Sequence, residues 1–299
     1  MDSATPRQLR IWPGGPPEGR PASVFAHAAS GLAGPHNPAD LARQLYVREA
    51  LNPWEVGPRP DESISPYTLP WFVEIENQRH GRRGRWLPRL LEFTKHCGET
   101  LLGVGTGLGT DWLQYARHGA HVTICCPSAG QLALIRRNFE LRGLSGRFIH
   151  TPADALPLEN ASIDVVCING LLHEVEDPQH VVKELFRVLK PGGKVLAVTP
   201  AYYNVDYFLA TCFPWHRWLK HRPRTGREAD SQFTAWKLRR LFAAFVEPRF
   251  YKRQLRRGEV PHIWRFVPLP ILERLMGRIL VIKAFKPVSA ITMNLPAAA

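Results

Sequence analysis

Residues 101–111 read LLGVGTGLGTD and place a glycine at every second position from Gly103 to Gly109. An apolar run precedes this stretch and a helix-like run follows it. Because glycine has no Cβ, the backbone N–H groups of such a turn can approach a ligand closely. The stretch therefore predicts a buried strand that ends in a ligand-binding turn just ahead of a helix.

Short apolar runs rich in β-branched residues alternate with helical patterns on both sides of this turn. This alternation predicts an α/β fold with a doubly wound, parallel sheet, whose ligands bind at the carboxyl ends of the strands. We expect strands over 100–105, 121–126, 147–151, 163–169, 194–199, 250–255 and 278–286. We expect helices over 71–77 and 87–93, from Thr110 to Gly119, within 177–193 up to Pro191, and over 238–245.

The spacing of the glycines excludes two common nucleotide sites. A dinucleotide turn of the form G-x-G-x-x-G would need a third glycine at Leu108 or at Thr110. A phosphate-binding P-loop would need a following Gly-Lys-Ser or Gly-Lys-Thr, and none follows the turn.

The turn instead resembles motif I of the class I S-adenosylmethionine-dependent methyltransferases, an acid-x-G-x-G-x-G pattern. The runs ALPL, SIDVV, LLHEVEDP and RVLKPGG resemble the small-molecule group of that family, which includes ubiquinone-pathway enzymes. The resemblance covers about residues 99–200, and FTAWKLRRLFAAF continues it more weakly. It implies a Rossmann-like methyltransferase sheet of seven strands, mostly parallel with an antiparallel last strand. It also implies S-adenosylmethionine as cofactor and a small-molecule methyl acceptor.

The resemblance implies a cofactor site around the glycine turn. Glycines at the turn would let the backbone approach the cofactor, and a helix starting near Thr110 would direct its N-terminus at a carboxylate. Asn169, at the end of the fourth strand, could face the methyl group or merely cap the strand. The predicted cofactor-binding residues are Gly103, Gly105, Thr106, Gly107, Asp111, Cys126, Ala153, Asp154 and Asn169. We expect a bulky side chain at position 105 to block the cofactor without unfolding the chain.

The sequence departs from the family pattern at three acidic positions. These correspond to Gly103, Cys126 and Pro152, and Asp154 and Asp111 are candidate substitutes. We expect the thiol at the second position to pack as a small hydrophobe. Cys126 ends the second predicted strand, and we expect this end to face a solvated cleft, so that an aspartate at position 126 would cost little stability.

Catalysis of methyl transfer needs little acid–base help, because a sulfonium is already a good leaving group. His173 and Glu174, in the loop after the fourth strand, are the candidate catalytic residues for orienting or deprotonating an acceptor. The alternative is an ordinary polar loop. Tyr202, Tyr203 and Trp215 either line an acceptor pocket or belong to the core.

Cysteine content, apolar segments and net charge limit the classes of protein to which the chain can belong. The five cysteines form no C-x-x-C pair, which argues against a disulfide framework or a metal site and favours a cytoplasmic protein. No secretory signal or membrane span of about 20 apolar residues is visible. The net charge of +13 is compatible with an anionic partner, although on charge alone a solvated basic surface is the preferred explanation.

The chain divides into five predicted parts. These are a Pro/Gly-rich and partly disordered extension over 1–66, a helical lead-in over 67–98, the cofactor-binding core over 99–200, a basic and aromatic insertion or lid over 201–235, and a C-terminal part over 236–299 that completes the sheet. Two alternatives to a methyltransferase remain. The missing acids favour a degenerate scaffold of the same fold. The runs WHRWLKHRPR and FYKRQLRRGE favour a nucleic-acid-binding or RNA-modifying protein.

Overall fold

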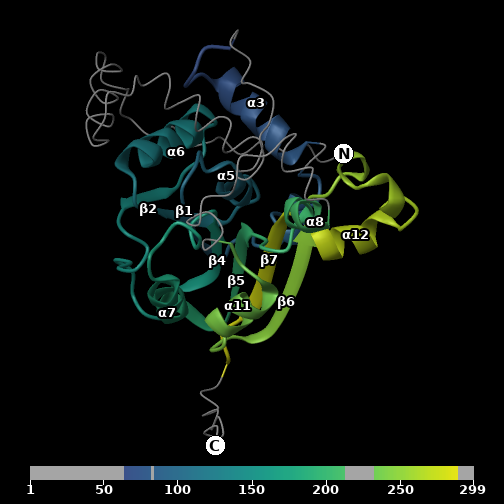
Figure 1. The fold of residues 1–299 in the computed structure, drawn as a ribbon. Coiled ribbons are helices and arrows are strands. Elements are labelled where there is room, and N and C mark those ends of the chain that lie inside the picture. Colours follow the sequence, from purple (N-terminus) through teal and green to yellow (C-terminus); the bar gives the residue numbers. More distant parts are fainter. Residues whose placement is uncertain (1–63, 82–83, 213–231, 289–299) are drawn as a thin grey trace, which may run out of the picture.

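The computed structural model describes residues 64–81, 84–212 and 232–288, and within them one seven-stranded sheet forms the centre of the molecule (Figure 1). The strands lie in the order β3-β2-β1-β4-β5-β7-β6. Their bounds are β1 Thr100–Gly105, β2 His121–Cys126, β3 Arg147–His150, β4 Ile163–Asn169, β5 Leu189–Pro200, β6 Val246–Arg253 and β7 Ile279–Phe285. The predicted extension over 1–66 falls almost entirely outside the described residues, as does the greater part of the insertion.

Sheet polarity follows the prediction. The strands β1 to β5 pair in parallel, whereas β7 runs antiparallel to both of its neighbours, β5 and β6. Almost every residue of β1, β4 and β7 is buried, as expected for strands covered by helices on both faces. The mostly parallel sheet with an antiparallel last strand is confirmed.

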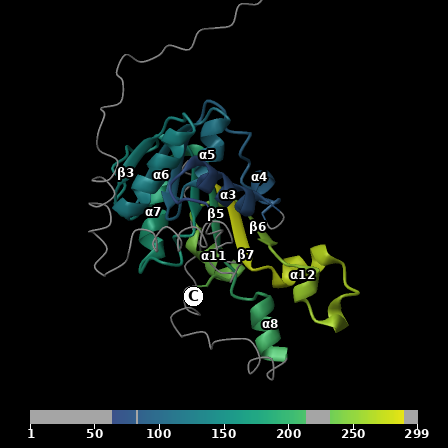
Figure 2. The ribbon, with the colours of Figure 1, turned by 90° about the horizontal axis from the view of Figure 1, so that it is seen from above.

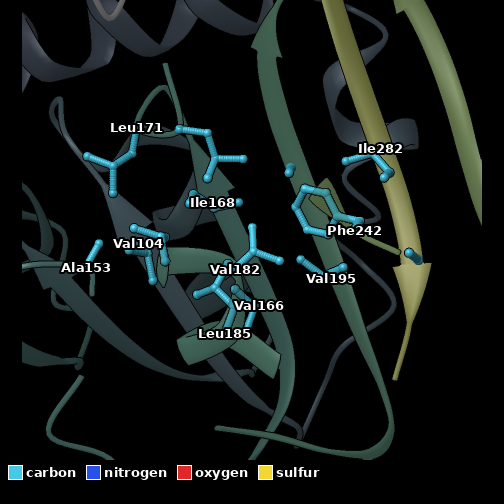
Figure 3. Packing of buried hydrophobic residues seen from close by; sticks show 14 of the residues in the cluster. Val104, Ala153, Val166, Ile168, Leu171, Val182, Leu185, Val195, Phe242 and Ile282 are labelled. Carbon is cyan, nitrogen blue, oxygen red and sulfur yellow. The ribbon is translucent and has the colours of Figure 1, made fainter. Parts of the chain in front are cut away.

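Helices cover the two faces of the sheet and create two separate cores. On one face α4, α5 and α6 bury a cluster around Trp112 and Phe139. On the other face α7 and α11 bury a cluster in which Val182 and Leu185 point towards Val166 (Figure 3). The helices are α3 Leu69–His80, α4 Leu87–Leu90, α5 Thr110–Arg117, α6 Ala129–Leu141, α7 Pro178–Val188, α8 Val205–Cys212, α11 Ala235–Leu241 and α12 Leu269–Met276.

Several boundaries differ from the sequence prediction. The helix expected over 87–93 stops at Leu90, and Glu92 takes a φ of 57°, which a continuing helix does not allow. The helix expected to reach Pro191 ends at Val188, because the chain turns directly into β5 at Leu189. The helix expected over 238–245 runs instead from Ala235 to Leu241. The strand expected over 250–255 occupies Val246–Arg253, where its register is set by pairing with β7.

The topology determines which edge of the sheet can hold a ligand. Strand β1 has β2 on one side and β4 on the other, so the strand order reverses at β1. In doubly wound sheets ligands bind beside the carboxyl ends of the strands at this switch point. The glycine turn after β1 lies there. Beyond the carboxyl end of β5, α8 and α12 form a projection from the body of the molecule (Figure 2).

Candidate functional site

The backbone of the glycine turn adopts conformations that only glycine takes easily. The φ angles are 151° at Gly105, 111° at Gly107 and 70° at Gly109. A Cβ added to Gly105 would lie 2.4 Å from the carbonyl oxygen of Asn169. The prediction that a bulky residue at 105 would leave the fold intact is therefore wrong, because the side chain would push β1 away from β4.

One side chain of the turn reaches the surface. Every residue from Leu101 to Thr110 is buried except Thr106, which is half-buried. The following N–H group, on Gly107, donates to Oε1 of Gln131 in α6 at 3.3 Å. The turn is thus tied to the helix after β2, and Thr106 marks its accessible side.

Asp111, in the first turn of α5, lies at the centre of a buried polar cluster. Arg79 donates from Nη2 to Oδ2 at 2.7 Å and from Nε to Oδ1 at 3.2 Å. Nε2 of His80 lies 2.9 Å from Oδ1, and Nδ2 of Asn169 donates to Oδ2 at 2.5 Å. The structure therefore brings together two predicted cofactor residues, Asp111 and Asn169, but it directs both carboxylate oxygens at protein donors.

The cluster also decides the charge state of the carboxyl group. Burial by itself would raise the pKa of Asp111, but the charge of Arg79 and the hydrogen bonds from His80 and Arg79 hold that pKa well below its usual range. Sequence reasoning missed Arg79 and His80. The only signal in the sequence was that these two basic residues are adjacent at the end of α3. A regular amphipathic helix would place such residues on its polar face, so the sequence did not indicate that they turn inwards.

Gly103 is enclosed by protein. It pairs with Ile124 and Cys167 in the middle of the sheet, and the ring of Trp112 lies directly over it. A Cβ on Gly103 would come within 2.8 Å of that ring. This position, where the family pattern has its first acid, accommodates the indole of α5.

Cys126, the position of the second acid, is fully buried at the end of β2. Its Sγ lies 3.4 Å from the carbonyl oxygen of Ser128 and 3.8 Å from Oε1 of Gln131. The prediction that it packs as a small hydrophobe is confirmed, and the prediction that this strand end faces a solvated cleft is wrong. The chain between β2 and α6 folds back over the thiol and covers it.

The third acidic position lies in the loop after β3. Pro152 and Asp154 are exposed, whereas Ala153 between them is buried. Oγ1 of Thr151 donates to the carbonyl oxygen of Ala155 at 2.8 Å and holds the loop in shape. Of the two candidate substitutes, Asp154 therefore offers its carboxylate to solvent, whereas that of Asp111 is enclosed.

The two candidate catalytic residues lie side by side after β4. Nε2 of His173 is 3.8 Å from Oε1 of Glu174, and the exposed fractions of their side chains are 10% and 34%. The histidine is thus shielded and the glutamate accessible. Further along, the rings of Tyr202 and Tyr203 pack edge to face with centroids 5.0 Å apart, and Tyr203 is exposed. Trp215 lies outside the described residues.

A cavity of about 640 Å³ lies at the other end of the sheet. Thr100, His121, Arg147 and Ile163 contribute to its lining, and each stands at the amino end of its strand. It is therefore remote from the glycine turn and separate from the switch point. Among the described residues no cluster of His, Cys, Asp and Glu could hold a metal ion, and no helix is long and apolar enough to cross a membrane.

Comparison with known proteins agrees with this geometry. Residues 101–197 match the family model described as a methyltransferase domain. The chain is 38% identical over 104 residues to a demethylmenaquinone methyltransferase of Clavibacter sepedonicus, covering 33% of this chain and 40% of that one. It is 31% identical over 176 residues to a ubiquinone biosynthesis O-methyltransferase of Methylocella silvestris, covering 56% and 66%.

A solved structure supports the fold. A SAM-dependent methyltransferase from Aquifex aeolicus superposes with a TM-score of 0.50 at 14% identity, covering 72% of this chain and 96% of that one. The chain spans 40% and 66% of the lengths of the two sequence relatives. Residues 101–197 therefore match a methyltransferase domain, and the described part of the chain has the fold of the class I S-adenosylmethionine-dependent methyltransferases.

Proposed function

We propose that the protein binds S-adenosylmethionine at the glycine turn and transfers its methyl group to a small-molecule acceptor. The observation that carries this proposal is the turn itself, which lies at the switch point of the sheet and has only Thr106 on its accessible side. A turn of this kind allows a ligand to approach the backbone closely. The methyltransferase domain over 101–197 supports the choice of ligand.

The surrounding groups fit both ends of the amino-acid part of that ligand. The N-terminus of α5 lies next to the turn, and a helix N-terminus favours a carboxylate. Asn169 already uses Nδ2 on Asp111, so its amide oxygen remains the group that can accept a hydrogen bond from an ammonium. In this proposal Asp111 is a positioning residue that fixes the amide of Asn169. The guanidinium of Arg79 neutralises the negative charge of Asp111.

S-adenosylmethionine supplies a methyl group on a sulfonium, which leaves easily. The protein's task is then to hold the acceptor in line with the carbon–sulfur bond and to exclude water. An acceptor that carries a proton must lose it, and Glu174 is the accessible base beside the shielded His173. We propose that Glu174 receives the proton, that His173 orients the acceptor, and that Tyr202 and Tyr203 border the acceptor.

A second candidate function is that of a binding or scaffold protein without catalysis. The observation that favours it is the loss of two acids whose places are now filled by protein. The indole of Trp112 covers Gly103, and the thiol of Cys126 is buried. Each hydrogen bond to a charged group contributes about 1.5–3 kcal/mol, so the loss of two would weaken binding by roughly a hundredfold to ten-thousandfold.

We further propose that the protein works in the cytoplasm. Cys97, Cys125, Cys126 and Cys167 all carry free thiols, which suits a reducing compartment.

Calorimetric titration of the full chain with S-adenosylmethionine, and with NAD as a control nucleotide, tests the proposed function. We expect heat of binding for S-adenosylmethionine and none for NAD. Thr106→Trp should lower the affinity by about tenfold or more, because a large side chain would fill the accessible side of the turn without requiring a positive φ. Ser145→Trp is the matched control, since this exposed residue borders the cavity at the amino ends of the strands.

Binding that is lost in Ser145→Trp and kept in Thr106→Trp would move the site to the other end of the sheet. Binding without methyl transfer to demethylmenaquinone or to a precursor of ubiquinone, the compounds named for the two relatives, would favour the scaffold. Absence of binding in the native chain would overturn the proposed function.

A further inference from the structure

The projection beyond β5 has an inner face that is well packed. We define the appendage as residues 254–278, which contain the short helices η1 Arg257–Glu259 and η2 His262–Trp264 and the helix α12. Leu272 and Met276 of α12 are buried against Val205 of α8 and against Leu255 and Val260. Figures 1 and 2 both show α12 beside α8, away from α6 and α7.

The outer face of the appendage is also apolar. The side chains of Phe266, Ile271 and Leu275 are 82%, 52% and 54% exposed. The last two lie four residues apart on α12 and therefore on the same side of the helix. Leu272 and Met276 lie about 100° further round the helix and face the inner cluster, so the apolar side of α12 is wider than the part that its packing buries. Exposed apolar surface of this kind is typical of a site that binds another protein or a membrane.

The appendage that carries these exposed apolar groups is also positively charged. The appendage contains five arginines and two glutamates. Arg256, Arg257 and Arg274 are exposed. Both glutamates are already engaged, Glu259 by Arg278 at 2.8 Å and Glu273 by the backbone N–H of Gln254 at 2.9 Å. The surface thus combines aliphatic and aromatic side chains with a net positive charge.

The combination of apolar side chains and positive charge distinguishes between three possible partners for this surface: a nucleic acid, another segment of the chain and a lipid bilayer. A nucleic acid would use the arginines, but it would leave the aliphatic side chains of Ile271 and Leu275 without a stacking role. The segment 213–231 of the chain carries five Lys and Arg against two Asp and Glu, so its charge has the same sign as that of the appendage. A lipid bilayer with anionic headgroups offers an apolar interior and negative charge together.

We propose that the appendage docks on the surface of an anionic lipid bilayer, with Phe266, Ile271 and Leu275 inserted below the headgroups and the arginines at the phosphates. The attachment is peripheral, because α12 has eight residues and is too short to span the hydrocarbon layer. The proposal goes beyond the proposed methyl transfer and does not depend on it.

Vesicle flotation with the full chain tests this proposal. The probes are vesicles of phosphatidylcholine alone and vesicles in which roughly one third of the lipid is phosphatidylglycerol. We expect the native chain to float with the anionic vesicles and to be released by high salt. The triple variant Phe266→Ser, Ile271→Ser, Leu275→Ser should reduce the bound fraction by about tenfold or more. The matched control Trp236→Ser, Val288→Ser removes two large exposed side chains outside the appendage and should bind like the native chain.

The remaining outcomes each overturn the proposal. No flotation of the native chain, or equal flotation of the triple variant, means that the apolar face does not insert. Binding of a single-stranded RNA that competes with the vesicles and persists in the triple variant means that the surface recognises polyanions. Self-association of the native chain that the triple variant abolishes means that a second copy covers the face. Circular dichroism verifies folding, and Arg256→Gln, Arg274→Gln provides a second variant that must weaken binding at low salt.

Discussion

The indole of Trp112 occupies the space directly over Gly103, where a Cβ would lie 2.8 Å from the ring atoms Cγ and Cδ2. The ring is held there by its Nε1, which donates to the carbonyl oxygen of Cys167 at 3.1 Å. A glycine in the middle of a buried strand thus makes room for a large side chain from the following helix. The first acid of the family pattern could not return to this position without displacing the indole.

The first prediction concerns this contact. Gly103→Ala should lower the free energy of unfolding by about 1–3 kcal/mol, because the methyl group overlaps the ring. Trp112→Leu should cost about 2–5 kcal/mol through lost burial and a residual void. When Gly103→Ala is combined with Trp112→Leu, the alanine should lower the free energy of unfolding by at least about 1 kcal/mol less than it does in the single variant. Urea unfolding of the four proteins measures the coupling, and strictly additive costs would show that the contact carries no strain.

The second prediction concerns the buried pair of Arg79 and Asp111. Arg79→Gln should destabilise the protein by about 3–5 kcal/mol, because it removes the arginine that compensates a buried carboxylate. Arg79→Gln, Asp111→Asn should recover part of that loss, since the uncompensated charge is gone. Arg117→Gln is the control and should change stability by about 1 kcal/mol or less, because the side chain of Arg117 is 35% exposed and its partner Glu76 keeps Arg142 at 2.9 Å. A double variant no more stable than Arg79→Gln would contradict the charge argument.

The third prediction concerns Cys126. Cys126→Asp should tighten the binding of S-adenosylmethionine by about tenfold, if the carboxylate accepts hydrogen bonds from the ribose hydroxyls. In the absence of cofactor it should cost about 1–3 kcal/mol of stability, because the buried carboxylate would face the acceptor oxygens of Ser128 and Gln131. Calorimetry and thermal unfolding measure the two effects. Cys126→Asn has the same shape without the charge, and equal affinity for both variants would refute a ribose-binding carboxylate.

The fourth prediction concerns stability in acid. Glu92 accepts hydrogen bonds from Lys194 at 2.6 Å and from Lys283 at 3.0 Å. Burial alone would raise the pKa of Glu92, but these two lysines lower it from 4.5 to about 2. A carboxyl group whose pKa is depressed by folding stabilises the protein above its unfolded pKa, and this stabilisation disappears as the pH falls from 4.5 towards 2.

Glu92→Gln should therefore remove about 1–2 kcal/mol of stability at pH 7, a value discounted for solvent screening, and should flatten the loss of stability below pH 4.5. Chemical unfolding at a series of pH values measures this slope. Glu176→Gln, at an exposed glutamate, is the control and should reproduce the native profile. An unchanged slope in Glu92→Gln would contradict the assignment.

Local patterns in the sequence were sufficient to predict a doubly wound α/β sheet. The runs 100–105, 121–126 and 163–169 form strands with the predicted bounds, because short β-branched segments flanked by turns have few other ways to bury themselves. The glycine spacing after the first run located the turn, since a positive φ at Gly107 and Gly109 is a local requirement. The order of these elements then left few topologies to choose from.

The site required the tertiary structure. Arg79 and His80 reach Asp111 across 32 and 31 residues of chain, and no periodicity in the sequence relates them. The burial of Cys126 depends on how the chain after β2 folds back over it, and the apolar outer face of α12 is defined only once its inner face has packed against α8.

The amino-acid sequence by itself thus located the turn and most of the strands, because hydrophobic periodicity and glycine geometry act over a few neighbouring residues, and the resemblance of its motifs indicated the family of the fold. The tertiary structure alone decided which side chains meet at the turn and which apolar face stays open. The reason is that these contacts depend on how helices pack on the sheet, where residues distant in the chain compete for the same space.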